Sequence, residues 1–162
     1  MMLRRICLSL ALLLALAPPA LAQEIRPFVS GSLKEITAAR QGKPFILSMW
    51  SLSCTHCREE LSLLSRMVKK YPNLDLVLIA TDTPEESDAI SATLRKSGLG
   101  GAQAWVFADP FADRLRFEID RKWHGELPRT YLYDSAHVVT AISGKLDRQR
   151  LEQWMHKHFG RS

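Results

Sequence analysis

The chain has 162 residues, of which 22 are Lys or Arg and 17 are Asp or Glu, so its formal net charge is +5. This length allows one domain with a full core, and 46% hydrophobic and 24% charged residues are typical of a globular protein. The basic residues are spread along the chain without an accompanying stripe of aromatics. Nucleic acid is therefore not expected as a partner.

The first 22 residues have the layout of an export signal. Arg4 and Arg5 precede an apolar run over residues 6–17, which is followed by two prolines and the small-residue sequence ALA. This order is typical of a secretory signal peptide cleaved between Ala22 and Gln23. An uncleaved anchor is the alternative, but spanning a bilayer takes about 20 apolar residues and the prolines interrupt this run.

We therefore predict a signal peptide over residues 1–22, a single domain over residues 23–162 and a periplasmic location. In the exported chain only Cys54 and Cys57 remain, because Cys7 leaves with the signal. A disulfide across two intervening residues closes a very small loop and adds little stability. The pair is therefore expected to serve chemistry, not stability.

The remaining chain alternates strand and helix patterns. FILSMW at residues 45–50 is a short apolar run, typical of a strand buried on both faces. Leu61, Leu64 and Val68 fall on one helical face. The predicted elements are a lead from residue 23, irregular or strand-like, a helix at 33–40, a strand at 45–50, a helix from the cysteines to 71, a strand at 74–80, a helix at 84–97, a strand at 104–108, a helix at 109–119, strands at 130–133 and 138–142, and a helix at 147–159.

These elements predict an α/β fold with a mixed central β-sheet flanked by helices. No composition change after residue 23 indicates a second domain.

The sequence WSLSCTHC places the two cysteines where a buried strand ends and a helix begins. Cys54 then lies at the positive end of a helix dipole, which favours its thiolate. His56 adds a nearby positive charge or hydrogen bond that tunes the cysteine pKa. Cys57, one turn into the helix, is expected to be the shielded thiol that resolves a mixed disulfide formed by Cys54.

A metal site is the competing interpretation of these cysteines. Structural zinc takes four ligands, and the exported chain offers one cysteine pair and scattered histidines, so no metal is predicted. Two thiolates and one imidazole suit copper, which stays open as a cofactor or cargo.

The chain resembles thioredoxin-fold proteins of the exported TlpA/ResA-like thiol–disulfide oxidoreductases. The resemblance rests on CTHC after Trp50, on Arg58 and Glu60 in a C-x-x-C-[RK]-x-E pattern, on a helical insert near residues 84–97, and on GELPRTYLYD around Pro128. It implies a thioredoxin fold with a TlpA-like helical insert and a cis peptide bond before Pro128.

The resemblance also implies roles for individual residues. Cys54 and Cys57 would be catalytic, and Glu60 would exchange a proton with a cysteine. Leu127 and Pro128 would contact substrate. Trp50 is grouped with them as a substrate-binding residue, and core packing beside the site is the other interpretation of it. Ser48 stands where thioredoxin has a buried aspartate, which leaves Glu60 as the candidate carboxylate. Arg129 is expected to be solvated, with contact to substrate as the alternative. For Trp123 and His124, a place in the substrate groove and a plain loop role are equally open.

The function implied is a periplasmic reductase of protein disulfides, kept reduced by a membrane electron donor of the CcdA/DsbD type. Cytochrome c maturation and metal-site assembly are the tasks the resemblance suggests. The Thr-His pair between the cysteines resembles DsbA-type oxidants, so a thiol oxidase is one alternative. A copper-binding or copper-chaperone protein is the other.

Overall fold

A computed structural model of the chain describes residues 23–160. The predicted signal peptide and its cleavage point fall outside these residues. Within the described part, no helix combines the length and the apolar character needed to cross a membrane.

The centre of the fold is a six-stranded sheet with the order β1-β4-β3-β2-β5-β6. The strands are β1 (Ile25–Phe28), β2 (Phe45–Trp50), β3 (Leu76–Ala80), β4 (Gln103–Phe107), β5 (Arg129–Tyr133) and β6 (Val139–Ser143). The first four strands in chain order run parallel, whereas β5 and β6 are antiparallel to their neighbours. The sheet is mixed, as predicted.

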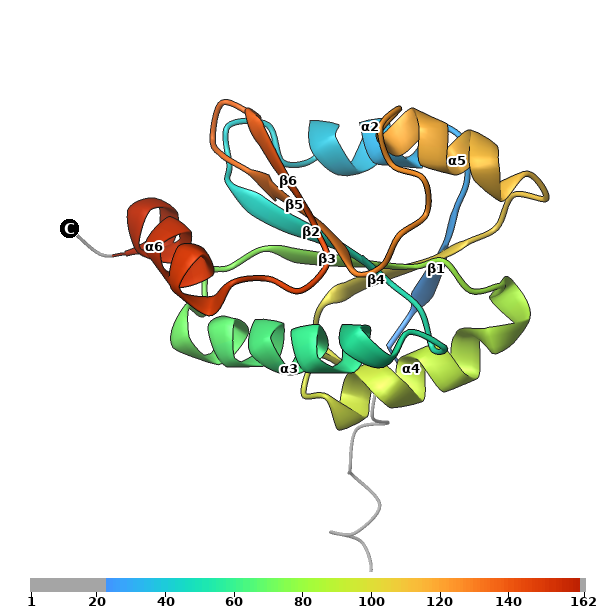
Figure 1. Ribbon diagram of the computed structural model, residues 1–162, viewed down its shortest axis with the longest axis horizontal. Helices are drawn as coiled ribbons and strands as arrows, with labels where there is room; N and C mark the ends of the chain where they lie inside the picture. The colour runs from blue at the N-terminus through green and yellow to red at the C-terminus, as the bar shows by residue number, and fades with distance from the viewer. Residues whose placement is uncertain (1–22, 161–162) are drawn as a thin grey trace, which may run out of the picture.

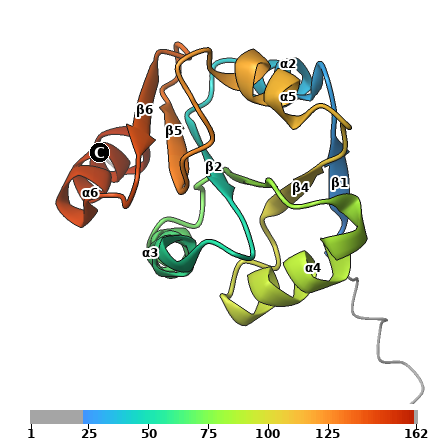
Figure 2. The ribbon, with the colours of Figure 1, turned by 45° about the vertical axis from the view of Figure 1, so that its right-hand side comes forward.

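Helices cover both faces of the sheet and make three layers (Figure 1). One face is covered by α3 (Thr55–Lys70), α4 (Ser87–Lys96) and α6 (Arg148–Phe159), and the other by α2 (Ser32–Ala38) and α5 (Ala112–Ile119). Figure 2 shows α3 and α4 next to each other on their side, with α2 and α5 together on the opposite side.

Strand β2 divides its side chains between the two faces because successive residues of a strand point in opposite directions. Ile46 and Trp50 belong to the core cluster under α3, whereas Phe45, Leu47 and Met49 belong to the cluster under α2 and α5. All six residues of β2 are buried. The same alternation directs Ser48 toward α3, which matters for the site.

Two predicted helices differ from the observed ones. The helix expected at 84–97 begins with a 3₁₀ turn, Pro84–Glu86, before α4. The helix expected from residue 109 begins at Ala112 instead. Asp109 accepts a hydrogen bond at 2.9 Å from the backbone N–H of Phe111, and this local turn competes with the first helical turn.

Candidate active site

Cys54 and Cys57 are joined by a disulfide at the N-terminus of α3. Cys54 is the N-cap residue, and its sulfur accepts a hydrogen bond at 3.2 Å from the backbone N–H of Cys57. Cys54 is half-buried, whereas Cys57 is completely buried. Cys54 is therefore the more accessible of the two cysteines, and the helix N-terminus stabilises negative charge on its sulfur.

The peptide bond between Leu127 and Pro128 is cis. The next residue, Arg129, pairs with Met49 in the register of β5 against β2. Pro128 thus lies beside the end of β2, where the segment leading to Cys54 begins. Its carbonyl accepts a hydrogen bond at 2.8 Å from Gly144, which ties the cis bond to the loop after β6.

Glu60 is a buried carboxylate on α3, 3% exposed and one turn after Cys57. It accepts hydrogen bonds from Thr130 Oγ1 at 2.6 Å, from Ser48 Oγ at 3.1 Å and from the backbone N–H of Leu146 at 3.2 Å. Burial raises the pKa of Glu60 above its ordinary value, and these hydrogen bonds offset part of that rise.

Glu60 and Cys57 share one face of α3 because they are three residues apart. Both are buried within the layer between α3 and the sheet. A carboxyl group with a raised pKa beside a buried thiol is suited to accept and return a proton. Glu60 thus lies buried on the helical face that carries Cys57, and its role in proton transfer stays a prediction.

Sequence reasoning missed the residues that hold Glu60. Thr130 lies directly opposite Ser48 in the strand register, so their hydroxyls face the same side of the sheet. Thr130 has no exposed surface, and its hydroxyl also lies 3.3 Å from Ser48 Oγ. The sequence signal for this role was Thr130 itself, a polar residue directly before the apolar run that ends β5. No sequence pattern indicated that the backbone N–H of Leu146 would also donate to Glu60.

Asp82 is a second carboxylate that the sequence did not single out. Both of its carboxylate oxygens lie 3.1 Å from the backbone N–H of Leu52, two residues before Cys54. Burial raises the pKa of Asp82, with that hydrogen bond opposing the rise. Asp82 therefore fixes the backbone that leads into the cysteine pair.

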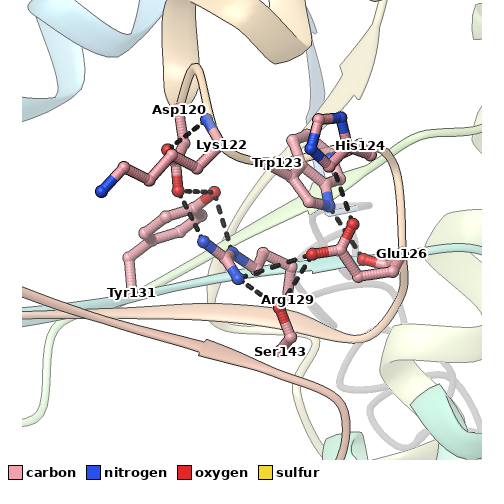
Figure 3. Close-up of polar contacts among 8 residues, drawn as sticks. All are labelled: Asp120, Lys122, Trp123, His124, Glu126, Arg129, Tyr131 and Ser143. Carbon is pink, nitrogen blue, oxygen red and sulfur yellow. Dashed lines mark hydrogen bonds and ion pairs between the residues drawn. The ribbon is translucent and has the colours of Figure 1, made fainter.

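Arg129, expected to be solvated, is 8% exposed and anchored on several sides (Figure 3). Its guanidinium donates to Asp120 at 2.5 Å, to the Tyr131 hydroxyl at 3.2 Å and to Ser143, and lies 3.6 Å from the Glu126 carboxylate. Partial burial opposes ionisation of Asp120, but hydrogen bonds from the Lys122 N–H and Arg129 hold its pKa below the ordinary value. The sequence expectation for Arg129 was wrong, because only the fold brings these partners together.

The loop before the cis bond is braced by the same group of residues. Trp123 is 3% exposed and donates from Nε1 to the Glu126 carbonyl at 2.8 Å, while the His124 N–H donates to the Glu126 carboxylate at 3.1 Å (Figure 3). Trp123 packs in the core cluster under α2 and α5, which Leu127 also contacts. Trp123 thus supports the loop from inside, and the His124 side chain is exposed.

Two further predicted site residues lie near the cysteines in different settings. Trp50 is 2% exposed and belongs to the core under α3. His56 is exposed in the first turn of α3, between the cysteines.

Among residues 23–160, no three histidine, cysteine or carboxylate side chains are grouped to hold a metal ion. Copper binding by the reduced thiols stays a prediction.

Comparison with known proteins agrees with this architecture. The protein-family model described as the AhpC/TSA family matches residues 29–142, more than half of the chain. No curated protein sequence matches.

Three solved structures illustrate the similarity in fold. A secreted Mycobacterium tuberculosis disulfide oxidoreductase homologous to E. coli DsbE is 22% identical over 74% of this chain and 85% of that chain, with a TM-score of 0.59. A thioredoxin family thiol:disulfide interchange protein from Chlorobium tepidum is 18% identical over 76% of this chain and 85% of that chain, with a TM-score of 0.61. A DsbF homologue from Corynebacterium diphtheriae is 19% identical over 74% of each chain, with a TM-score of 0.57. At these identities the similarity shows the fold, and the predicted thioredoxin-like fold is confirmed.

Proposed function

Because the chain belongs to the AhpC/TSA family and has a thioredoxin-like fold, we propose that it is a thiol–disulfide oxidoreductase acting on other proteins through Cys54. The observation that carries this proposal is the unequal exposure of the two cysteine residues. Cys54 is half-buried at a helix N-terminus, and its disulfide partner Cys57 is fully buried beneath it.

In the reductive direction, the reaction proceeds by two exchanges. The Cys54 thiolate attacks one sulfur of a substrate disulfide, the substrate S–S bond breaks, and one substrate thiolate leaves. The Cys57 thiolate then attacks Cys54 Sγ, the intermolecular S–S bond breaks, and the second substrate thiolate leaves. The substrate gains two electrons, and the protein ends with the Cys54–Cys57 disulfide.

The buried position of Cys57 requires a proton acceptor when its thiol becomes a thiolate. Glu60 is the candidate, since it is buried on the same helical face and its pKa is raised by burial. The two protons of the dithiol leave with the reduced substrate or to solvent. Pro128 has no backbone N–H, so it would leave Cys54 free of a competing backbone donor, and the Leu127 backbone before it would bind an extended substrate segment.

For location and direction, we infer an exported reductase. The signal-like layout of residues 1–22 supports export. A relative of the same fold is named as a secreted disulfide oxidoreductase, which agrees with that location. A membrane donor of the CcdA/DsbD type would return electrons to the Cys54–Cys57 disulfide, and apocytochrome c or a copper-site protein is the proposed kind of substrate.

The test of the activity is capture of the mixed disulfide. In a Cys57→Ser variant the second exchange cannot occur, so Cys54 should accumulate as a thiol-sensitive adduct with other proteins. A Cys54→Ser variant is the matched control and should yield no adducts. Absence of adducts in the Cys57→Ser strain would contradict the proposed function.

The reduction potential tests the direction. A reductase requires a potential near or below that of thioredoxin, about −270 mV, whereas a potential near about −120 mV would identify an oxidant. Equilibration of the protein with glutathione buffers and quantification of free thiols gives this value.

A further inference from the structure

A groove of about 620 Å³ lies between α3 and α4 and begins at the segment leading to the cysteines. These helices are neighbours on one face of the sheet in both ribbon views (Figures 1 and 2). The groove is lined by Trp50, Ser51 and Leu52 at one end, by Arg58, Ser62, Ser65, Arg66 and Lys69 of α3, and by Thr93, Lys96 and Ser97 at α4.

The charged residues lining the groove are all positive. Arg58, Arg66, Lys69 and Lys96 contribute four cations, and no Asp or Glu lines the groove. All four are exposed, and none forms an ion pair with another residue of the described chain. Glu59, next to Arg58, is instead paired with Lys145.

Three of the four cations are arranged along the length of α3, and Lys96 lies at the end of α4. Arg58, Ser62, Arg66 and Lys69 follow spacings of four, four and three, which place them on one helical face. Close packing brings the end of α4 near this face, since a Cβ on Gly98 would lie 3.0 Å from Ser65 Oγ. The groove is therefore a concave positive surface with hydroxyl groups between the charges.

The start of the groove lies next to the reactive cysteine. Arg58 directly follows Cys57, and Leu52 packs against the same core cluster as Cys54. With a helical rise of about 1.5 Å per residue, Arg66 lies about 14 Å and Lys69 about 18 Å along α3 from Cys57. An extended peptide, at about 3.3 Å per residue, covers this distance in about four to six residues.

We propose that this groove binds an acidic segment of the disulfide substrate, positioned about four to six residues from the cysteine that reacts with Cys54. The proposal rests on the proposed function and adds the substrate class. Unpaired cations in a groove attract carboxylates and increase the rate of encounter, an effect that falls as salt rises. A lipid surface is the less suitable partner because a flat bilayer does not follow a groove between two helices.

The probes are synthetic peptides that carry a disulfide to a small thiol and three glutamates at positions four to six from the cysteine. One peptide has the glutamates on the N-terminal side and another on the C-terminal side, and each has a matched glutamine version. The measurement is the second-order rate constant of exchange with the reduced full-length protein, at low salt and at about 0.5 M salt.

The test variant is Arg66→Glu/Lys69→Glu, which reverses two groove charges about two and a half turns or more along α3 from Cys57. The matched control is Lys34→Glu/Lys43→Glu, which makes the same net charge change at exposed positions on and just after α2, across the sheet. Phosphatidylglycerol vesicles serve as a membrane probe for all three proteins.

The wild type and the control should react at least about tenfold faster with one glutamate peptide than with its glutamine version at low salt, and the preference should shrink at high salt. The Arg66→Glu/Lys69→Glu variant should lose the preference while keeping its rate with glutamine peptides.

Equal rates with glutamate and glutamine peptides in the wild type would overturn the acidic-segment proposal and leave the oxidoreductase function intact. Failure of every peptide to exchange would instead count against the proposed function. Vesicle binding that is lost in Arg66→Glu/Lys69→Glu, without any peptide preference, would assign the groove to anionic lipid and overturn the proposal.

Discussion

Thr130 donates a hydrogen bond from Oγ1 to Glu60 Oε1 at 2.6 Å, although 70 residues separate the two in the chain. The bond joins the strand that follows the cis bond to the helix that carries the cysteines. The candidate proton acceptor is thus held by the same strand that presents Pro128.

Glu60 should make the folded state less stable as the pH rises. Burial raises the pKa of Glu60 in the folded state above its ordinary value of 4.5, so the folded protein binds this proton more tightly than the unfolded chain does. The stability that protonation of Glu60 adds to the folded state is fully present below about pH 4.5 and is lost as the pH rises through the raised folded pKa. A tenfold change in the proton affinity of the carboxylate corresponds to about 1.4 kcal/mol. In urea unfolding of the oxidised protein from about pH 4 to pH 8, the stability of the wild type relative to the Glu60→Gln variant should decline.

The control for this experiment is Glu35→Gln, at an exposed position on α2. It should keep the wild-type pH dependence of unfolding. An identical pH dependence in Glu60→Gln and wild type would show that Glu60 does not titrate with a raised pKa.

Thr130→Val tests the hydrogen bond itself. Valine keeps the shape of threonine but removes the donor, so Glu60 loses the partner at 2.6 Å. We expect a loss of about 1–3 kcal/mol in the free energy of unfolding at neutral pH, because a buried carboxylate is left less satisfied. Thr140→Val, at an exposed position on β6, is the matched control and should change stability by less than about 0.5 kcal/mol. Equal effects of the two substitutions would contradict the role assigned to this bond.

His56→Ala should lower the reduction potential, making the protein a weaker oxidant. A positive or donating imidazole stabilises the thiolate, and therefore the reduced form. A tenfold loss of thiolate stability at Cys54 corresponds to about 30 mV. Glutathione equilibration measures the change, and His156→Ala on α6 should leave the potential unchanged. A potential that stays constant in His56→Ala would remove His56 from the tuning of the cysteines.

Arg129→Lys should destabilise the loop before the cis bond. Lysine keeps the charge but does not reproduce the planar fork that reaches Asp120, Tyr131 and Ser143. We expect a loss of about 1–3 kcal/mol from urea unfolding. Arg148→Lys, in an exposed pair with Glu152, should lose less than about 0.5 kcal/mol. Similar losses in the two variants would indicate that the buried network adds no more than a surface ion pair.

The position of the cysteines and most helices and strands were predictable from local sequence. The apolar run of β2 followed by two cysteines and a helical Leu pattern placed Cys54 at a helix N-terminus, and the structure makes it the N-cap. Asp147, at the start of the helix expected over residues 147–159, is the N-cap of α6 and accepts a hydrogen bond from the Arg150 N–H at 2.8 Å. These features depend on residues a few positions apart, so periodicity and capping preferences reveal them.

The sequence by itself determined that this is an α/β domain with a reactive cysteine pair and a proline segment able to face it. Only the tertiary structure decided which groups donate hydrogen bonds to the buried Glu60 carboxylate. It also decided that Arg129 is buried and that Arg66 and Lys96 line one groove. Those facts depend on the register of β5 against β2 and on the packing of α3 beside α4. Both are contacts between distant segments, and no local pattern in the chain encodes them.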